Sequence, residues 1–285
     1  MKKLGHYSLA LAGLLLLSSA GATLAQSADA GDNSSTAGTS TRTTKTAKTK
    51  SSSDDWNGFY IGGYGGFGMR RATADTTTVF SSTGYFASSS VPAVATAGRQ
   101  RLNSTKFGGG GTVGYNHQSG NWVVGAEADL GVLSGTTTAT TTTTYPCCAP
   151  SSFTVTQSVK SSWLLTARPR IGYVWGNTMA YVTGGLAVTK LNYQETFADT
   201  FATAAESGGF NKTVTGWTGG AGVEHKLNDR WSVKGEYLYA DFPRRTVTST
   251  NLTAFTPSSS FPTNVFTHSI KVNEHLVRFG INFHF

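Results

Sequence analysis

Apolar and polar residues alternate along this chain in a series of separate segments. The last segment, "HLVRFGINFHF", places an apolar residue at every second position from Val277 to Phe285, with Arg278 between the first two. A period of two residues is typical of a β-strand whose two faces meet different surroundings. Eight such segments can be counted: 56–69, 105–118, 122–133, 162–175, 179–193, 213–227, 231–242 and 273–285.

The connections between these segments are alternately long and short. Three are short, at 119–121, 176–177 and 228–230, and contain the Gly, Asn and Asp residues that tight hairpins favour. The four long connections are rich in Thr, Ser and Ala and cover about 70–104, 134–161, 194–212 and 243–272. Such an asymmetry is typical of outer-membrane barrels, whose short turns face the periplasm. We therefore expect an all-β fold, an eight-stranded antiparallel up-and-down transmembrane β-barrel with short periplasmic turns, four long extracellular loops and both termini in the periplasm.

Charged residues occupy the strand face opposite to the apolar residues. In segment 162–175, Leu165 and Ile171 alternate with Arg168 and Arg170. In a membrane barrel the apolar face contacts lipid, the charged face lines the lumen, and the last strand pairs with the first. A water-soluble β-sandwich with the same charges on its solvated face is the alternative. The interior charge network that we expect in the barrel consists of Glu127, Asp129, Arg168, Arg170, Glu224, Lys234, Glu236 and Arg278.

Two roles are open for this network. The interior of an eight-stranded barrel is about filled by side chains. Acidic and basic groups in such an interior have to pair with one another, which favours a structural brace. The alternative is a gate, in which the ion pairs exchange partners and open a narrow path for water.

Aromatic and basic residues predict contacts with the membrane. Aromatic residues gather where the segments begin and end, and Trp56, Trp122, Trp175 and Trp231 are expected at the membrane–water boundary. Basic residues concentrate in the first long connection and its flanks, and at the start of the fourth. At the outer rim they would meet lipopolysaccharide phosphates, which suit the donors of arginine; a solvated loop is the alternative. These residues are Arg70, Arg71, Arg99, Arg101, Lys106, Arg244 and Arg245.

The N-terminal part differs in composition from the barrel segments. Lys2 and Lys3, an apolar run and small residues up to Ala25 are typical of a secretory signal peptide, expected at 1–25. Residues 26–55 contain no aromatic or large aliphatic residue, so we expect a disordered linker, with peptidoglycan contact as a hypothesis. The barrel domain is expected at 56–285. The chain carries a net charge of +8, but export argues against nucleic acid as its partner.

Several segments resemble a known family. "WNGFYIGGYGGFG", "GAEADL", "ARPRIGYVW" with "MAYVTGGLA", "GWTGGAGVEHKLNDRWSVKGEYLYADF" and the terminal "VRFGINFHF" resemble the small outer-membrane barrel family of alphaproteobacteria. That family includes immunogenic, porin-like and haemin-binding surface proteins and is similar in architecture to the OmpA transmembrane barrel. The resemblance implies an outer-membrane protein with a structural or surface-antigen role and at most a narrow pore. It also implies that Phe283 and Phe285 form the C-terminal signal read by the barrel-assembly machinery.

Other functions are weaker alternatives. Haemin binding would use Tyr85, Tyr145 and His268, which fall in the expected loops. An outer-membrane enzyme would need a Ser, His and acid set, to which His268-Ser269 and Glu274-His275 are the nearest approach. We expect His275 to be an interfacial polar residue instead, and we expect no catalytic residues, no metal ligands and no resident cofactor.

The two cysteines are neighbours, Cys147 and Cys148. Export to an oxidising compartment permits a vicinal disulfide. The Cα spacing of about 3.8 Å between neighbours is shorter than ordinary disulfides prefer, so two free thiols or a bridge to another chain remain as alternatives. A metal site is disfavoured because "YPCCAP" has no second pair of ligands.

Overall fold

The computed structural model describes residues 55–132, 135–255 and 257–285. The expected signal peptide and nearly all of the expected linker lie outside these residues. In chain order the described elements are β1 (Gly58–Thr78), α1 (Ser90–Ala97), β2 (Gln100–Arg101), β3 (Ser104–Ser119), β4 (Trp122–Val132), β5 (Gly135–Thr144), β6 (Ser152–Trp175), β7 (Thr178–Asp199), β8 (Ala205–Lys226), β9 (Trp231–Ser249), β10 (Thr253–Ala254), β11 (Ser259–Ser260) and β12 (Phe266–His284).

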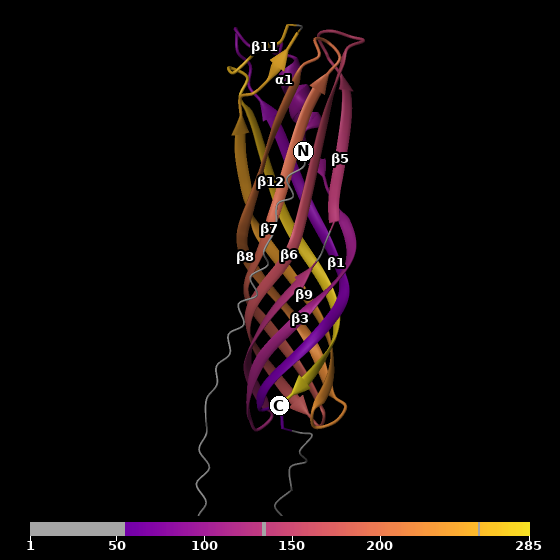
Figure 1. Ribbon diagram of the computed structural model, residues 1–285, viewed down its shortest axis with the longest axis vertical. Helices are drawn as coiled ribbons and strands as arrows, with labels where there is room; N and C mark the ends of the chain where they lie inside the picture. Colours follow the sequence, from indigo (N-terminus) through magenta and orange to yellow (C-terminus); the bar gives the residue numbers. More distant parts are fainter. Residues whose placement is uncertain (1–54, 133–134, 256) are drawn as a thin grey trace, which may run out of the picture. The chain divides into compact units, whose positions relative to one another are not determined.

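The long strands close into a barrel (Figure 1). Each pairs antiparallel with its neighbours in the order β1, β3, β4, β6, β7, β8, β9 and β12, and β12 pairs again with β1 from Tyr60↔His284 to Thr78↔Phe266. β5 pairs with the first part of β6, on the same side that β4 occupies along the second part, so β5 continues the position of β4 in the barrel wall. The expected eight-stranded antiparallel barrel, with the last strand paired to the first, is confirmed.

The two ends of the barrel differ. At one end, which we call the turn end, lie the C terminus and the short turns after β3, β6 and β8 (Figure 1). Gly120 and Gly176 occupy the left-handed region there, with φ of +60° and +55°, as tight turns require. At the opposite end, the loop end, α1 and β11 lie among the longer connections.

The strand boundaries differ from those that the sequence predicted. Large parts of the four expected long connections are strand: β1 continues to Thr78, β7 continues to Asp199, and β8 begins at Ala205. The threonine-rich stretch of β5 pairs with β6 along its whole length, from Gly135↔Ser161 to Thr144↔Ser152. Threonine is β-branched and fits a strand, but a run of it on both faces carries no alternation.

The outer surface carries an apolar band. On β1 the exposed apolar side chains lie between Phe59 and Met69, which matches the roughly 9–11 residues that a tilted strand needs to cross a bilayer core. Paired aromatic rings border the band on both sides: Trp122 with Tyr173 toward the turn end and Trp217 with Tyr239 toward the loop end. This arrangement is typical of a transmembrane barrel.

Aromatic side chains fill the barrel interior at the loop end. Phe153, Phe197 and Phe266 are at most 1% exposed. Phe86 packs against Phe197 and Phe266, and Phe153 stacks on Phe197. Val94 of α1 belongs to the same cluster. We call this group the aromatic cap. No helix in the described part of the chain is long and apolar enough to cross a membrane.

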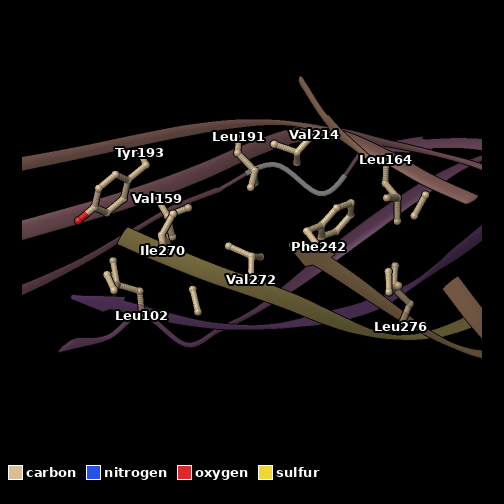
Figure 2. Packing of buried hydrophobic residues seen from close by; sticks show 14 of the residues in the cluster. Leu102, Val159, Leu164, Leu191, Tyr193, Val214, Phe242, Ile270, Val272 and Leu276 are labelled. Atoms are coloured by element: carbon tan, nitrogen blue, oxygen red, sulfur yellow. The ribbon is translucent and has the colours of Figure 1, made fainter. Parts of the chain in front are cut away.

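The interior is layered, as the inward side chains of β12 illustrate. From the turn end they run from His284 and Asn282 through Arg278, Leu276 and Glu274 to Val272, Ile270, His268 and finally Phe266 of the aromatic cap. Figure 2 shows the apolar layer, in which Val272 and Ile270 lie among Val159, Leu191, Val214 and Phe242. Charged and apolar layers therefore alternate along the barrel axis.

Candidate functional site

The eight residues of the interior charge network come together inside the barrel. Each is at most 4% exposed, and they project from β4, β6, β8, β9 and β12. Arg168 occupies a central position: its Nη2 lies 2.7 Å from Glu127 Oε1 and 2.8 Å from Asp129 Oδ2. Its Nη1 lies 3.2 Å from Glu236 Oε1.

The other three bases complete the network. Arg278 Nη1 lies 2.8 Å from Asp129 Oδ1, and Arg278 also pairs with Glu236. Arg170 Nη1 lies 3.1 Å from Glu224 Oε2. Lys234 Nζ lies 2.8 Å from Glu127 Oε2. All four carboxylates therefore have at least one cationic partner.

Inward tyrosines supply further hydrogen bonds to these carboxylates. The hydroxyl of Tyr60 donates to Glu127 at 2.7 Å and that of Tyr181 donates to Glu236 at 3.1 Å. The guanidinium of Arg170 lies over both rings, 4.7 Å from the Tyr60 centroid and 5.0 Å from the Tyr181 centroid. Such contacts lower the cost of keeping charges away from water.

The network ties distant strands together across the lumen. Glu127 on β4 reaches Lys234 on β9, and Asp129 on β4 reaches Arg278 on β12. β4 and β9 lie on opposite sides of the barrel, since three strands separate them in either direction. The arrangement can therefore brace the wall and occupy the space through which a solute would pass.

Two of the residues expected to contact lipopolysaccharide are not on the outer surface. Arg70 is 5% exposed and points inward, where its Nε lies 2.9 Å from Glu274 Oε1 and its Nη2 donates to Ser161. Lys106 is half-buried, on the face of β3 opposite to the exposed Phe107. The prediction was wrong for Arg70 because β1 continues to Thr78 and turns this side chain inward. It was wrong for Lys106 because alternation along β3 places Lys106 on the inner face.

The other five predicted contacts are exposed: Arg71, Arg99, Arg101, Arg244 and Arg245. Arg99 and Arg244 both pair with Asp75, at 3.4 Å and 2.8 Å. Lys160, Lys190 and Lys212 are exposed on β6, β7 and β8, likewise on the loop-end side of the apolar band. We call these eight residues the basic collar.

Trp56 does not lie at the membrane boundary. It is 0% exposed, its ring lies edge-on to His284, and Lys226 Nζ lies 5.2 Å from its centroid. The chain enters the barrel mouth before β1 begins, which places the ring inside. Trp122, Trp175 and Trp231 do point outward, with exposures of 56%, 51% and 42%.

The expected haemin ligands do not lie on an open surface. His268 is 0% exposed and Tyr145 is 4% exposed. The hydroxyls of Tyr85 and Tyr145 both donate to Asp199. Burial and the Asp199 carboxylate raise the pKa of both hydroxyls above their ordinary value.

The two cysteines form a vicinal disulfide. Cys147 and Cys148 are joined, with their Cα atoms 3.8 Å apart. The pair lies in the connection between β5 and β6. It lines a cavity of about 200 Å³ at the loop end, together with Tyr85, Phe86 and Phe201.

The residues considered for an enzyme lie on opposite faces of β12. His268 and Glu274 are buried in the interior, whereas Ser269 contacts the exposed Arg244 and His275 contacts Tyr237 outside. Neighbours in a strand point to opposite sides, so neither dipeptide brings its two side chains into one site.

A second polar cluster was missed by the sequence analysis. Glu195 on β7, Glu206 on β8 and His268 on β12 have fully buried side chains, and one ligand atom from each lies within 4.8 Å of the others. We call these residues the Glu–Glu–His cluster. Burial and the charge of Glu206 raise the pKa of Glu195 to about 10. Both glutamates fell in the expected loop 194–212, although inward Leu191, Tyr193, Glu195 and Phe197 keep a period of two.

Comparison with known proteins gives a family and several relatives. A family model described as outer membrane protein beta-barrel domain matches residues 12–283. The chain is 36% identical over 181 residues to the 31 kDa outer-membrane immunogenic protein of Brucella melitensis, covering 63% of this chain and 66% of the relative. It is 27% identical over 187 residues to the 22 kDa outer membrane protein of Rhizobium leguminosarum, covering 66% and 64%. The chain thus spans slightly less than two thirds of the length of these relatives.

Solved structures with some similarity are much more distant in sequence. Neisserial surface protein A is 11% identical with a TM-score of 0.33, and the match covers 78% of this chain and 99% of that chain. OprG from Pseudomonas aeruginosa is 12% identical with a TM-score of 0.40, covering 80% and 98%.

Proposed function

This chain belongs to the outer membrane protein beta-barrel family, and we propose that it serves as a closed, non-enzymatic barrel that presents its loop end at the cell surface. The barrel is anchored in the outer membrane by its apolar band. The observation that carries the proposal is the interior charge network, which ties opposite walls of a narrow lumen together.

The network acts as a brace in this proposal. A gate would need ion pairs that can exchange partners, but Arg168 is held by three carboxylates at once. Moving such a group would leave buried charges without partners, which is costly. We therefore expect no sustained conductance through the folded wild-type barrel.

Planar-bilayer recording tests this role. Protein that has passed a folding check by heat-dependent gel mobility should leave the membrane electrically silent. Glu127→Gln combined with Lys234→Met removes one cross-lumen pair together with its charges, and is the matched variant. Conductance steps from the wild type would support the gate, whereas steps from the double variant alone would support the brace.

The orientation follows from the asymmetry of the two ends. Short turns of outer-membrane barrels face the periplasm, so the turn end and Phe285 are assigned to the periplasm. Phe285 is 79% exposed there and Phe283 packs against Trp231, which leaves the terminal ring available to the assembly machinery. Protease treatment of intact cells should cleave only at the loop end.

A surface-antigen role is consistent with the relatives, which are named immunogenic outer-membrane proteins. The basic collar would hold the barrel against lipopolysaccharide phosphates on the loop-end side of the apolar band. Replacing Arg71, Arg101 and Arg245 with Gln should weaken lipopolysaccharide co-purification, whereas Lys226→Gln at the turn end should not. Equal co-purification would remove this part of the proposal.

The absence of enzymatic activity is also part of the proposal. Wild type and His275→Ala should be equally inactive in phospholipase and lipid A deacylation assays. Activity that is lost in His275→Ala would establish an enzyme instead.

A further inference from the structure

The Glu–Glu–His cluster lies between two apolar layers. Toward the turn end, Tyr193 and Ile270 belong to the apolar layer of Figure 2. Toward the loop end, Phe197 and Phe266 belong to the aromatic cap, and the Phe266 ring stacks near His268. Two carboxylates are therefore held in a part of the interior with little access to water.

No N–H group and no Ser, Thr or Tyr hydroxyl among the described residues donates a hydrogen bond to Glu195 or to Glu206 Oε2. The polar neighbours of the Glu195 carboxyl are the carboxyl of Glu206 and His268 Nδ1, which lies 3.4 Å from Glu195 Oε2. Glu206 Oε1 accepts from Ser249. Burying a carboxylate without a hydrogen-bond donor destabilises the fold. A ligand that enters the cluster could be held by these oxygens.

The cluster also differs from the other buried acids in the described part of the chain. Glu127, Asp129, Glu224, Glu236 and Glu274 each lie within 4 Å of an arginine or lysine nitrogen. Glu195 and Glu206 have no arginine or lysine partner among the described residues, and the basic group beside them is the imidazole of His268, at 3.4 Å from each. Two acids that face one histidine lack a compensating cation of fixed charge.

The cluster stands at a gap in the barrel wall. The pairing of β8 with β9 ends at Trp217↔Asp241. From there to the loop end, the described backbones of β8 and β9 share no ladder, and a cleft of about 500 Å³ lies between Gly209–Val214 and Arg245–Val247. Two side-chain hydrogen bonds bridge the gap: Ser249 donates to Glu206, and Asn251 donates to the carbonyl of Ser207.

We propose that Glu195, Glu206 and His268 bind one divalent transition-metal ion of the zinc class, and that this ion links β7, β8 and β12 beside the gap. One imidazole nitrogen and two carboxylate oxygens are ligands that Zn²⁺ takes at about 2.0–2.2 Å. Mg²⁺ and Ca²⁺ prefer oxygen ligands alone, so the histidine favours the zinc class.

The surroundings orient the imidazole as metal sites require. His268 Nδ1 lies 3.1 Å from Thr76 Oγ1 and Nε2 lies 2.8 Å from Ser249 Oγ. A single ion uses one ring nitrogen, and the other keeps its hydroxyl partner, as in most metal sites with histidine. Glu195 also belongs to the residues that line a hollow of about 550 Å³ on the paired strands β7 and β8.

The test is Zn²⁺ binding to the untagged, full-length, refolded barrel after removal of metal by chelation. Elemental analysis after equilibrium dialysis should give one Zn²⁺ per folded chain. Glu195→Gln keeps the shape of the side chain and relieves acid–acid repulsion, so it should fold and weaken binding more than about 100-fold, beyond the loss of an outer-shell partner. His268→Gln should do the same.

His275→Gln is the matched control, because His275 lies on β12 but faces outward. It should bind like the wild type. Saturating Zn²⁺ should also raise the melting temperature of the wild type and of His275→Gln but not of Glu195→Gln. The proposal is overturned if folded wild type binds no stoichiometric Zn²⁺, or if Glu195→Gln and His268→Gln bind like the wild type.

Discussion

Arg168 on β6 stands directly opposite Glu127 on β4, and its Nη2 lies 2.7 Å from a carboxylate oxygen of that residue. The pair belongs to adjacent strands, but both side chains also reach partners elsewhere in the lumen: Asp129 and Glu236 for Arg168, Lys234 for Glu127. A contact between neighbouring strands is thereby joined to contacts across the barrel.

Replacing Arg168 should be strongly destabilising. Arg168→Met leaves buried carboxylates with fewer partners, and loss of one member of a buried ion pair costs about 3–5 kcal/mol. Urea unfolding of the refolded protein, followed by tryptophan fluorescence, measures the free energy of unfolding. Arg99→Met is the control, since its side chain is 80% exposed, and it should change stability by less than about 0.5 kcal/mol. Equal effects of the two substitutions would show that the interior charge network does not stabilise the fold.

Arg70 and Arg71 should behave differently although they are neighbours. Arg70 is inside and pairs with Glu274, whereas Arg71 is exposed. We expect Arg70→Ala to lower the free energy of unfolding by about 3–5 kcal/mol and Arg71→Ala to leave it nearly unchanged. Urea titrations of both variants in the same detergent give the comparison. A larger effect of Arg71→Ala would mean that Arg71, and not Arg70, points into the barrel.

The closure between β1 and β12 can be tested at a glycine. A Cβ atom on Gly66 would lie 2.1 Å from Val277 O and 2.9 Å from Arg278 Cα, so Gly66→Ala should force the two strands apart. Gly63→Ala on the same strand meets nothing nearer than 3.8 Å. The fraction of folded protein on unboiled gels should fall for Gly66→Ala and stay at the wild-type value for Gly63→Ala. A normal folded fraction for Gly66→Ala would contradict this register.

The loop end should lose stability at high pH. Burial and Asp199 raise the pKa of Tyr85 and Tyr145 above 10 in the folded state, while unfolded tyrosines ionise near about 10. The folded protein then holds more protons than the unfolded chain above pH 10, so the free energy of unfolding falls as the pH rises. Urea unfolding at pH 9 and pH 11 measures the fall.

Tyr145→Phe removes one of these ionisations, so its stability should depend less on pH over the same interval. Tyr173→Phe changes an outward-facing tyrosine and should keep the wild-type dependence. If the free energy of unfolding falls equally for Tyr145→Phe and the wild type, the hydrogen bond of Tyr145 to Asp199 does not contribute to the pH dependence.

The sequence was most informative within the apolar band. There, lipid on one side and a charged lumen on the other impose strict alternation, so the facing of Leu165, Arg168 and Ile171 could be predicted residue by residue. The convergence of eight charged residues on one network also followed, because they share a face and a barrel is narrow. Their exact partners could not be predicted, since pairing across the lumen depends on the register between strands.

Alternation was harder to recognise beyond the band. In β6 the stretch from Ser152 to Val159 points Phe153, Val155 and Val159 inward and threonine or serine outward, so the apolar face is the inner one. In β5 threonine occupies both faces and no contrast remains. The extensions of β1, β7 and β8 beyond the band were likewise expected to be loops, which placed Arg70 at the surface and concealed the Glu–Glu–His cluster.

The central claim is a closed barrel in the outer membrane, and the gel mobility of the outer-membrane fraction with and without boiling tests it most directly. We predict that the unboiled protein is in that fraction and migrates as a compact band, and that boiling shifts it to the mobility of the unfolded chain. Recovery in the soluble periplasmic fraction, with the same mobility before and after boiling, would contradict the account.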